Sequence, residues 1–190
     1  NSAFSGSSDQ ATERHNKSNW NNLKVGVDYN FTKKDVAGIV VTGSLNPWKN
    51  WQNSYSNLRD ADGSINTTLL SDAYNANKTR NINTNFNYKH SFDSTGREIT
   101  VDLDQGYYKN TGTNFLTTEI YDPGNIQRGN TILLEGNLPS EIRIYTAKTD
   151  YVHPFSKNMK LEAGIKAGFV NTDNNVIYQR DTSTGWKTDY

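Results

Sequence analysis

The sequence contains no cysteine, one methionine, four prolines and no excess of either charge. The missing cysteines exclude disulfides, thiolate catalysis and thiolate metal sites. No run approaches the ~20 consecutive apolar residues of a transmembrane helix, and no stretch of the sequence has the pattern of a signal peptide. The 20 basic and 20 acidic residues give a net charge of zero and form no basic block, so nucleic acid is not an expected partner.

Apolar residues are also scarce, at 33% of the 190-residue chain. Adding the 14 glycines brings the figure to roughly 40%, below the ~45–50% of a soluble globular domain. Low hydrophobicity is the signature of disorder, but the 11 Tyr, 7 Phe and 4 Trp stand against it. A β-barrel accounts for both facts, since alternate residues of its strands face a water-filled lumen.

A hairpin-sized pattern occurs three times, at residues 23–44, 80–108 and 142–170. Each copy is an alternating run that ends in acid-or-amide plus tyrosine, followed by a short polar turn and a second alternating run. The tyrosines are Tyr29, Tyr88 and Tyr151. Period-two alternation predicts strands, so the fold class we expect is all-β, an antiparallel meander of about six long strands in one segment of an outer-membrane β-barrel.

Three long polar connections, at residues 45–78, 109–141 and 171–190, are predicted as loops. Weak strand signals at 114–121 and 176–180 suggest hairpin extensions, and only 67–76 resembles a short helix. Short turns on one side and long loops on the other are typical of outer-membrane barrels.

The alternation also predicts which face is apolar. Runs of about ten residues at ~3.3 Å each, tilted by ~45°, rise roughly 23 Å, close to the ~25 Å apolar band of such barrels. We expect a lipid-facing band that includes Val25, Val27, Phe86, Tyr88, Val101, Leu103, Ala163 and Ile165.

Aromatic residues gather where the runs meet the short turns, at Tyr29, Phe31, Tyr88, Phe92, Tyr151 and Phe155. This placement fits the aromatic girdle of a membrane barrel. The alternative is ordinary cross-strand packing at hairpin ends. Recurrence in all three copies favours the girdle.

Several motifs resemble the β-barrel of TonB-dependent outer-membrane receptors, closest to the outer membrane protein β-barrel family. They are Gly26-Val27-Asp28-Tyr29, the Asn-x-Asn-Tyr-x-His-x-Phe-Asp run at 85–93, and Lys148-Thr149-Asp150-Tyr151 followed by Pro154 and Leu161-Glu162-Ala163-Gly164. The resemblance covers most of residues 21–170. It implies an energised receptor that imports an unidentified ligand, with outer-membrane lipid, a plug domain and the TonB system as partners. The chain begins at Asn1 with its only methionine at Met159, so we expect a piece of such a receptor.

Candidate site residues are few. Trp48, Trp51 and Tyr55 lie in the first long connection, and either contact a ligand or anchor the connection at the membrane interface. The histidines His15, His90 and His153 have no ligand spacing, so no metal or other cofactor is expected. Glu98, Asp102 and Asp104 share a face, which suits paired acids but suits lumen lining better. No catalytic motif is present, and an enzyme is not expected.

One alternative from a different class stays open at this point. A soluble β-sandwich module, binding carbohydrate or acting as an adhesin, would use Trp48 and Trp51 at its site. It would bury one face of each sheet in a shared core.

Overall fold

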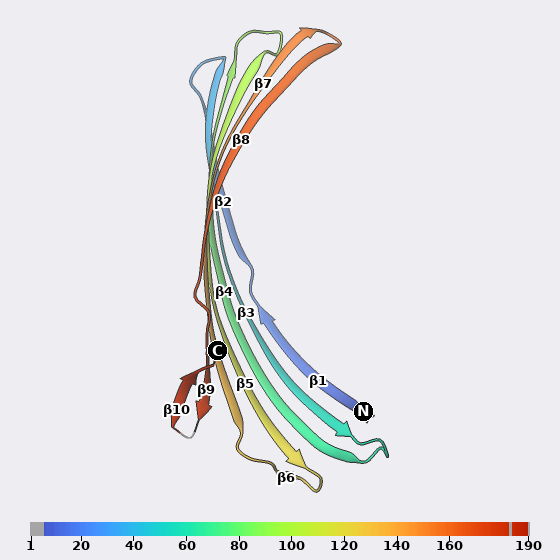
Figure 1. Cartoon of the computed structure of the whole chain (residues 1–190). Helices are drawn as coiled ribbons and strands as arrows, with labels where there is room; N and C mark the ends of the chain where they lie inside the picture. Colours follow the sequence, from blue (N-terminus) through green and yellow to red (C-terminus); the bar gives the residue numbers. More distant parts are fainter. Residues whose placement is uncertain (1–5, 183, 190) are drawn as a thin grey trace.

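The computed structural model describes residues 6–182 and 184–189, and they form one antiparallel sheet in a single curved layer (Figure 1). The elements are β1 (Ser7–Ser18), β2 (Asn21–Asn30), β3 (Asp35–Arg59), β4 (Ile65–Ser91), β5 (Glu98–Asp122), β6 (Ile126–Gln127), β7 (Ile132–Ser156), β8 (Met159–Asn174), β9 (Ile177–Thr182) and β10 (Gly185–Thr188). The all-β fold predicted from the sequence is confirmed, and the sheet is not closed.

Six strands lie side by side in the main part of the sheet, if two pairs of almost continuous strands are each counted as one. β1 and β2 lie end to end along β3, and β8 and β9 lie end to end along β7. Between β1 and β2, the amide of Asn19 donates to the carbonyl of Pro47 at 3.1 Å. Proline has no N–H to return, so the ladder is interrupted there while the register continues unchanged.

The three predicted hairpins are confirmed by the pairing of β2 with β3, β4 with β5 and β7 with β8. Their turns are short. The amide of Phe31 donates to the carbonyl of Asp35 at 3.0 Å, and that of Phe92 to Arg97 at 2.9 Å. Gly96 has a φ of +94°, which glycine adopts without strain.

The prediction of loops at 45–78 and 109–141 is wrong for most of both segments. β3 continues to Arg59, β4 begins at Ile65, β5 reaches Asp122 and β7 begins at Ile132. The 67–76 segment is strand and not helix. Both faces of the sheet carry polar residues here, so the apolar alternation that reveals a strand is absent. The last connection, 171–190, also contains strand, and its residues 183 and 190 lie outside the described part.

The sheet has no second layer. No hydrophobic residue of the described segments is buried. Large apolar side chains such as that of Ile165, which is 75% exposed, have no second layer packed over them. A β-sandwich needs two stacked sheets with a shared core, so the structure rules out the sandwich alternative for residues 6–182 and 184–189. In the same residues, no helix is long and apolar enough to cross a bilayer.

The sheet curves along its strands, with a convex and a concave side (Figure 1). Every glycine within β2–β8 except Gly43 lies on the concave face, at Gly26, Gly38, Gly106, Gly112, Gly136, Gly164 and Gly168. Side chains on the concave side are crowded together by the curvature, and glycine relieves this crowding. A Cβ at Gly38 would overlap the Asp28 carboxylate and lie 2.9 Å from the amide of Asn87.

Gly38→Val should therefore destabilise the sheet by about 1–3 kcal/mol, the usual cost of overpacking. Gly43 is the matched control on the convex face, where the nearest atom to an added Cβ is the Asn81 carbonyl oxygen at 3.8 Å. Gly43→Val should be neutral or slightly stabilising, since strand glycine is unfavourable. Urea unfolding of both variants is the measurement, and equal midpoints would contradict the crowding argument.

Candidate functional site

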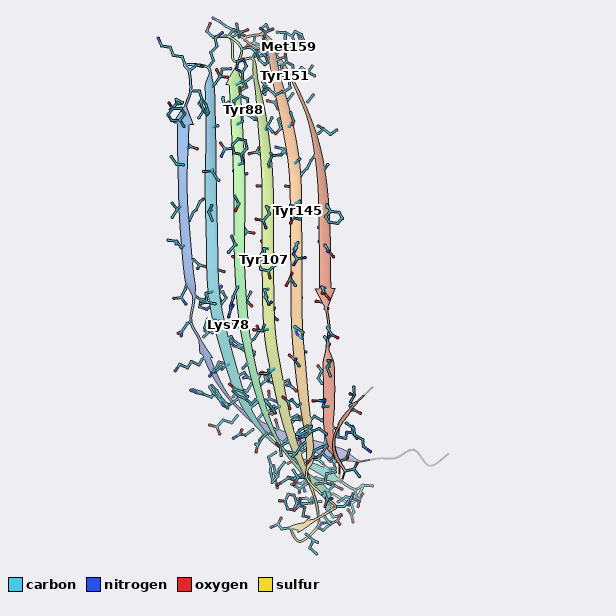
Figure 2. The ribbon with its side chains drawn as sticks, turned by 90° about the vertical axis from the view of Figure 1, so that its left-hand side faces the viewer. Lys78, Tyr88, Tyr107, Tyr145, Tyr151 and Met159 are labelled. Atoms are coloured by element: carbon cyan, nitrogen blue, oxygen red, sulfur yellow. The ribbon has the colours of Figure 1, made fainter. Side chains whose placement is uncertain are left out.

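The register of the sheet separates an apolar face from a polar one over the three hairpins. The cross-strand register aligns all eight residues of the predicted lipid-facing band on one face of the sheet, which is the convex face (Figure 2). One row across the sheet reads Val27, Ile39, Phe86, Leu103, Ala147 and Ala167. Figure 2 views this side and labels Tyr88, Tyr107, Tyr145 and Tyr151 on it.

The apolar band has defined limits along the strands. On β5 it runs from Ile99 to Tyr107, about 26 Å of strand at ~3.3 Å per residue. One row further on, the convex face carries the charged residues Arg80, Lys109, Glu141 and Asp173. The face therefore changes from apolar to charged over two rows, because Arg143 already lies opposite Tyr107 in the last row of the band.

Aromatic rings lie at the short-turn end of the band. His90 and Phe92 are 4.7 Å apart between ring centroids, Phe92 and Tyr151 are 6.2 Å apart, and His153 and Phe155 are 4.7 Å apart. The second and third hairpins thus share one line of rings. In the first hairpin, Tyr29 and Phe31 form a separate pair at 4.8 Å.

The concave face of the hairpins is polar. Asp104 accepts hydrogen bonds from the Asn85 amide at 2.7 Å and from the Thr146 hydroxyl at 2.8 Å. Glu98 pairs with Lys89. Asp104 is therefore occupied by cross-strand hydrogen bonds, and Asp102 lies in a row with Lys148 and Lys166. This is the geometry of a polar lining rather than of an acid–base pair.

A shallow hollow of about 440 Å³ lies on the same concave face. Its lining includes Lys24, Asn83, Asp104 and Tyr108 together with the apolar residues Val40 and Ile144. A hollow of mixed charged, amide, aromatic and apolar character suits a solute that carries both polar and apolar groups.

We call the part of the sheet that begins at this charged row the distal half. Beyond the row, four asparagines form a ladder of side-chain hydrogen bonds across the concave face. Asn50 donates its side-chain amide to Asn16 at 2.6 Å, Asn75 to Asn50 at 3.3 Å and Asn114 to Asn75 at 2.5 Å. Asn50 is only 7% exposed. This amide ladder ties β1, β3, β4 and β5 together where no apolar band is present.

No local sequence pattern indicates the amide ladder. Its four members are far apart in the chain and become neighbours only because the register aligns them in one row. Asparagine is abundant in the chain, so no single member stands out. Only knowledge of the strand pairing reveals the ladder.

The three aromatic candidates of the first long connection do not form one cluster. Trp51 and Tyr55 lie on the convex face and Trp48 on the concave face, since residues of β3 alternate in direction. The Trp51 ring packs between His15 at 5.6 Å and Tyr74 at 5.4 Å. Trp48 lies in the row next to the amide ladder, opposite Asn77.

A convex groove of about 500 Å³ lies beside Tyr55 in the distal half. Three acids, Glu13, Asp72 and Glu119, contribute to its lining. Next to this groove, the Tyr121 hydroxyl donates to Glu119 at 2.9 Å, and this bond raises the pKa of Tyr121.

The far end of the distal half is held by an ion pair. The carboxylate of Asp9 accepts from Arg59 Nε at 2.9 Å and from Asn57 at 3.2 Å, and both bonds lower the pKa of Asp9. Arg59 also donates to the Gly63 carbonyl at 3.1 Å in the adjoining turn. The first strand is thereby fastened to the turn between β3 and β4.

The three histidines have separate neighbours. His15 packs on Trp51, His90 Nδ1 lies 2.6 Å from Asp35, and His153 Nδ1 lies 3.0 Å from the Tyr151 hydroxyl. Within the residues that the structure describes, no group of three His, Cys, Asp or Glu side chains has the geometry to hold a metal ion.

Residues 90–190, more than half of the chain, match the model of the outer membrane protein beta-barrel family. The matched segment contains most of the second hairpin and all of the third. No curated protein matches the chain.

The amide ladder makes a specific prediction for the distal half. Asn75→Ala removes two rungs and leaves the buried Asn50 carbonyl without its donor, which should cost about 1–3 kcal/mol. Asn81→Ala is the control on the same strand and face, because no side-chain hydrogen bond of Asn81 is described, and it should change stability by less than about 0.5 kcal/mol. Hydrogen exchange of the β3 and β4 amides reports the local opening. Equal exchange in both variants would show that the ladder contributes nothing.

Proposed function

This chain belongs to the outer membrane protein beta-barrel family, and we propose that it forms part of the barrel wall of a TonB-dependent receptor that takes up a nutrient. It is a protein of the outer membrane. The observation that carries the proposal is the two-faced sheet, with an apolar convex band and a polar concave face along the same strands. Outer-membrane barrels direct these two kinds of residue to lipid and to lumen respectively.

The dependence on TonB rests on the sequence motifs that resemble such receptors. The structure supports a transport role through its polar concave face, which runs from the short turns into the distal half. In this arrangement the short turns face the periplasm and the distal half extends outside the cell. Loss of uptake by the receptor in cells that lack the TonB system tests this dependence, and undiminished uptake would overturn it.

The open edges of the sheet indicate what completes the wall. β2 pairs only with β3, and β8 pairs only with β7, so within the described residues one side of each strand is unpaired. Unpaired backbone groups are not tolerated in the hydrocarbon of a membrane. We therefore propose that further strands pair with β2 and β8 and close the barrel.

The lipid-facing role of the convex band is tested at its central row. Leu103→Arg should cost about 2–4 kcal/mol of stability in a bilayer, because an arginine at the midplane must leave water. Asn83→Arg is the matched control, since Asn83 lies on the concave face of the neighbouring strand, where lumen water solvates the charge. Folding into lipid vesicles, followed by the heat-dependent gel shift of folded barrels, is the measurement. If Asn83→Arg fails to insert while Leu103→Arg inserts normally, the faces are reversed.

The role of the aromatic candidates in ligand capture is tested by separating the two faces. Trp48 lies on the concave face, on the path of a ligand, whereas Trp51 lies on the convex face. Trp48→Ala should weaken ligand binding roughly two- to tenfold, taking ring stacking at ~0.5–1.5 kcal/mol. Trp51→Ala should leave the affinity within about twofold.

Binding and uptake by the receptor, at matched surface expression, measure the difference between the two variants. A loss with Trp51→Ala alone would place the ligand on the convex side. Unchanged affinity in both variants would remove these residues from ligand capture.

A further inference from the structure

Two of the four prolines in the chain lie in one row of the sheet. The row crosses β3, β4, β5 and β7 on the convex face and consists of Pro47, Lys78, Thr111 and Pro139. It is one row beyond the charged row at Arg80, and therefore outside the apolar band. A proline within a sheet removes a hydrogen bond from the ladder, so it is rare on strands that have neighbours on both sides. Two ladder bonds are thus lost at one level, which we call the proline row.

Both outer strands are interrupted at the proline row. Two residues separate β1 from β2, and two separate β8 from β9. The register is the same before and after each interruption, which places Asn19 opposite Pro47 and Asn175 opposite Pro139. Figure 1 and Figure 2 show the two interruptions at the same level, and Figure 2 labels Lys78 at that level. The prolines and the interruptions therefore form one line across the sheet.

The missing N–H donors of the prolines point toward the interruptions. The amide of Asn19 donates to the Pro47 carbonyl at 3.1 Å, so the backbone groups of Pro47 face the outer strand. Hydrogen-bonded and non-bonded pairs alternate along an antiparallel ladder, and the turn bond between β4 and β5 fixes this alternation for the strands that follow. Carried through the register to β7, the alternation directs Pro139 toward Asn175. Each proline thus lacks the bond that would join its strand to the outer strand.

The side chains around the proline row differ on its two sides. On the membrane side, the Asn46 side-chain carbonyl accepts from the Asn21 amide at 3.1 Å, and the Asn21 side chain donates to the Leu45 carbonyl at 3.0 Å. These bonds cap β2 at its first residue. In the next concave row on the distal side, the side-chain oxygen of Asn77 is buried and has no hydrogen-bond partner among the described residues. A buried oxygen without a partner costs free energy, so the side chains here do not replace the lost backbone bonds.

The sheet is bonded more firmly on both sides of this line. Beyond it, the amide ladder joins β1, β3, β4 and β5, and Asp9 pairs with Arg59 at the tip. Before it, the pairing of β2 with β3 and of β7 with β8 runs without interruption through the apolar band. Strands β3, β4, β5 and β7 continue through the line, so the two parts stay joined. Two well-bonded parts joined along a weaker line have the construction of a hinge.

We propose that the proline row is a hinge line, at which the part of the distal half beyond it bends as one plate against the part of the sheet that lies in the membrane. The curvature of the sheet sets the direction of the movement (Figure 1). Stronger bending carries the distal plate over the concave side, and straightening carries it away. The hinge itself needs only the sheet. That its bending sets the width of the outer opening rests on the barrel role proposed above.

The test restores the missing donors. Pro47→Val plus Pro139→Val gives both strands an N–H at the proline row and a side chain that favours strands. Thr111→Val is the matched control, because it places the same side chain in the same row on a strand that already has its N–H. Hydrogen exchange of the full chain in lipid vesicles measures the local opening at the two interruptions.

The exchange rates should mark the hinge line before any residue is changed. In the wild type, the amides of Asn19 and Asn175 should exchange at least about tenfold faster than those of Lys17 and Asp173, which face the same neighbouring strands, because a less stable segment opens more often. The double proline variant should slow this exchange roughly two- to tenfold, the effect of one backbone bond. The Thr111→Val control should change it less than about twofold.

The bending is measured by pulsed electron paramagnetic resonance. The chain has no cysteine, so spin labels attach only to the introduced residues of Gln10→Cys plus Lys24→Cys. Both positions are exposed, on β1 and β2, and lie about 46 Å apart along the strand direction. The wild type should give a broad distribution of distances between the labels. The double proline variant should narrow it, and the Thr111→Val control should leave it unchanged.

Three outcomes would overturn the hinge. Equal exchange of Asn19 and Lys17, and of Asn175 and Asp173, would show that the line is as firm as its surroundings, and this comparison needs no variant to fold. Equal distance distributions in the wild type and the double proline variant would show a fixed bend. An equal effect of Thr111→Val would assign the change to the branched side chain. If the hinge fails while the lipid-face variants of the convex band behave as expected, the barrel assignment stands.

Discussion

The constant cross-strand register is the constraint on which the rest of this structure depends. The pairing of β3 with β4 runs from Asp35 opposite His90 to Leu58 opposite Thr67 before it shifts, and the other shift lies at the turn end of β7. Side chains alternate with period two, so a slip of one residue would move every side chain to the opposite face. The apolar band and the amide ladder exist only because no slip occurs along the strands.

The same register explains how a single sheet holds together although none of its described hydrophobic residues is buried. Backbone hydrogen bonds run along whole strands, and polar side chains add bonds between neighbouring strands where the apolar band ends. In the distal half this support includes the amide ladder on the concave face and the pair of Asp9 with Arg59 at the tip. In the band itself, no described residue covers the apolar side chains from a second layer, which suits a lipid environment.

The sequence allowed the hairpins and the apolar face to be predicted because alternation there is strong. Residues such as Val25, Val27 and Phe86 alternate with polar neighbours, and that pattern has one structural meaning. The strand segments within 45–78 and 109–141 were predicted as loops because both of their faces carry polar residues. For the candidate site, spacing grouped Trp48 with Trp51, but the two residues are an odd number of positions apart, which places them on opposite faces. The amide ladder depends on pairing between strands that are distant in the sequence, and neither composition nor spacing reveals that pairing.

The outer edge formed by β8 and β9 changes along its length in a way that follows from its surroundings. In the distal half, β10 pairs with β9 and covers its outer edge. Water can satisfy whatever backbone groups remain exposed at that level. Along β8, within the apolar band, the outer edge has no such cover among the described residues. Only another strand satisfies those groups in hydrocarbon, so the edge of β8 is the place where we expect the barrel wall to continue.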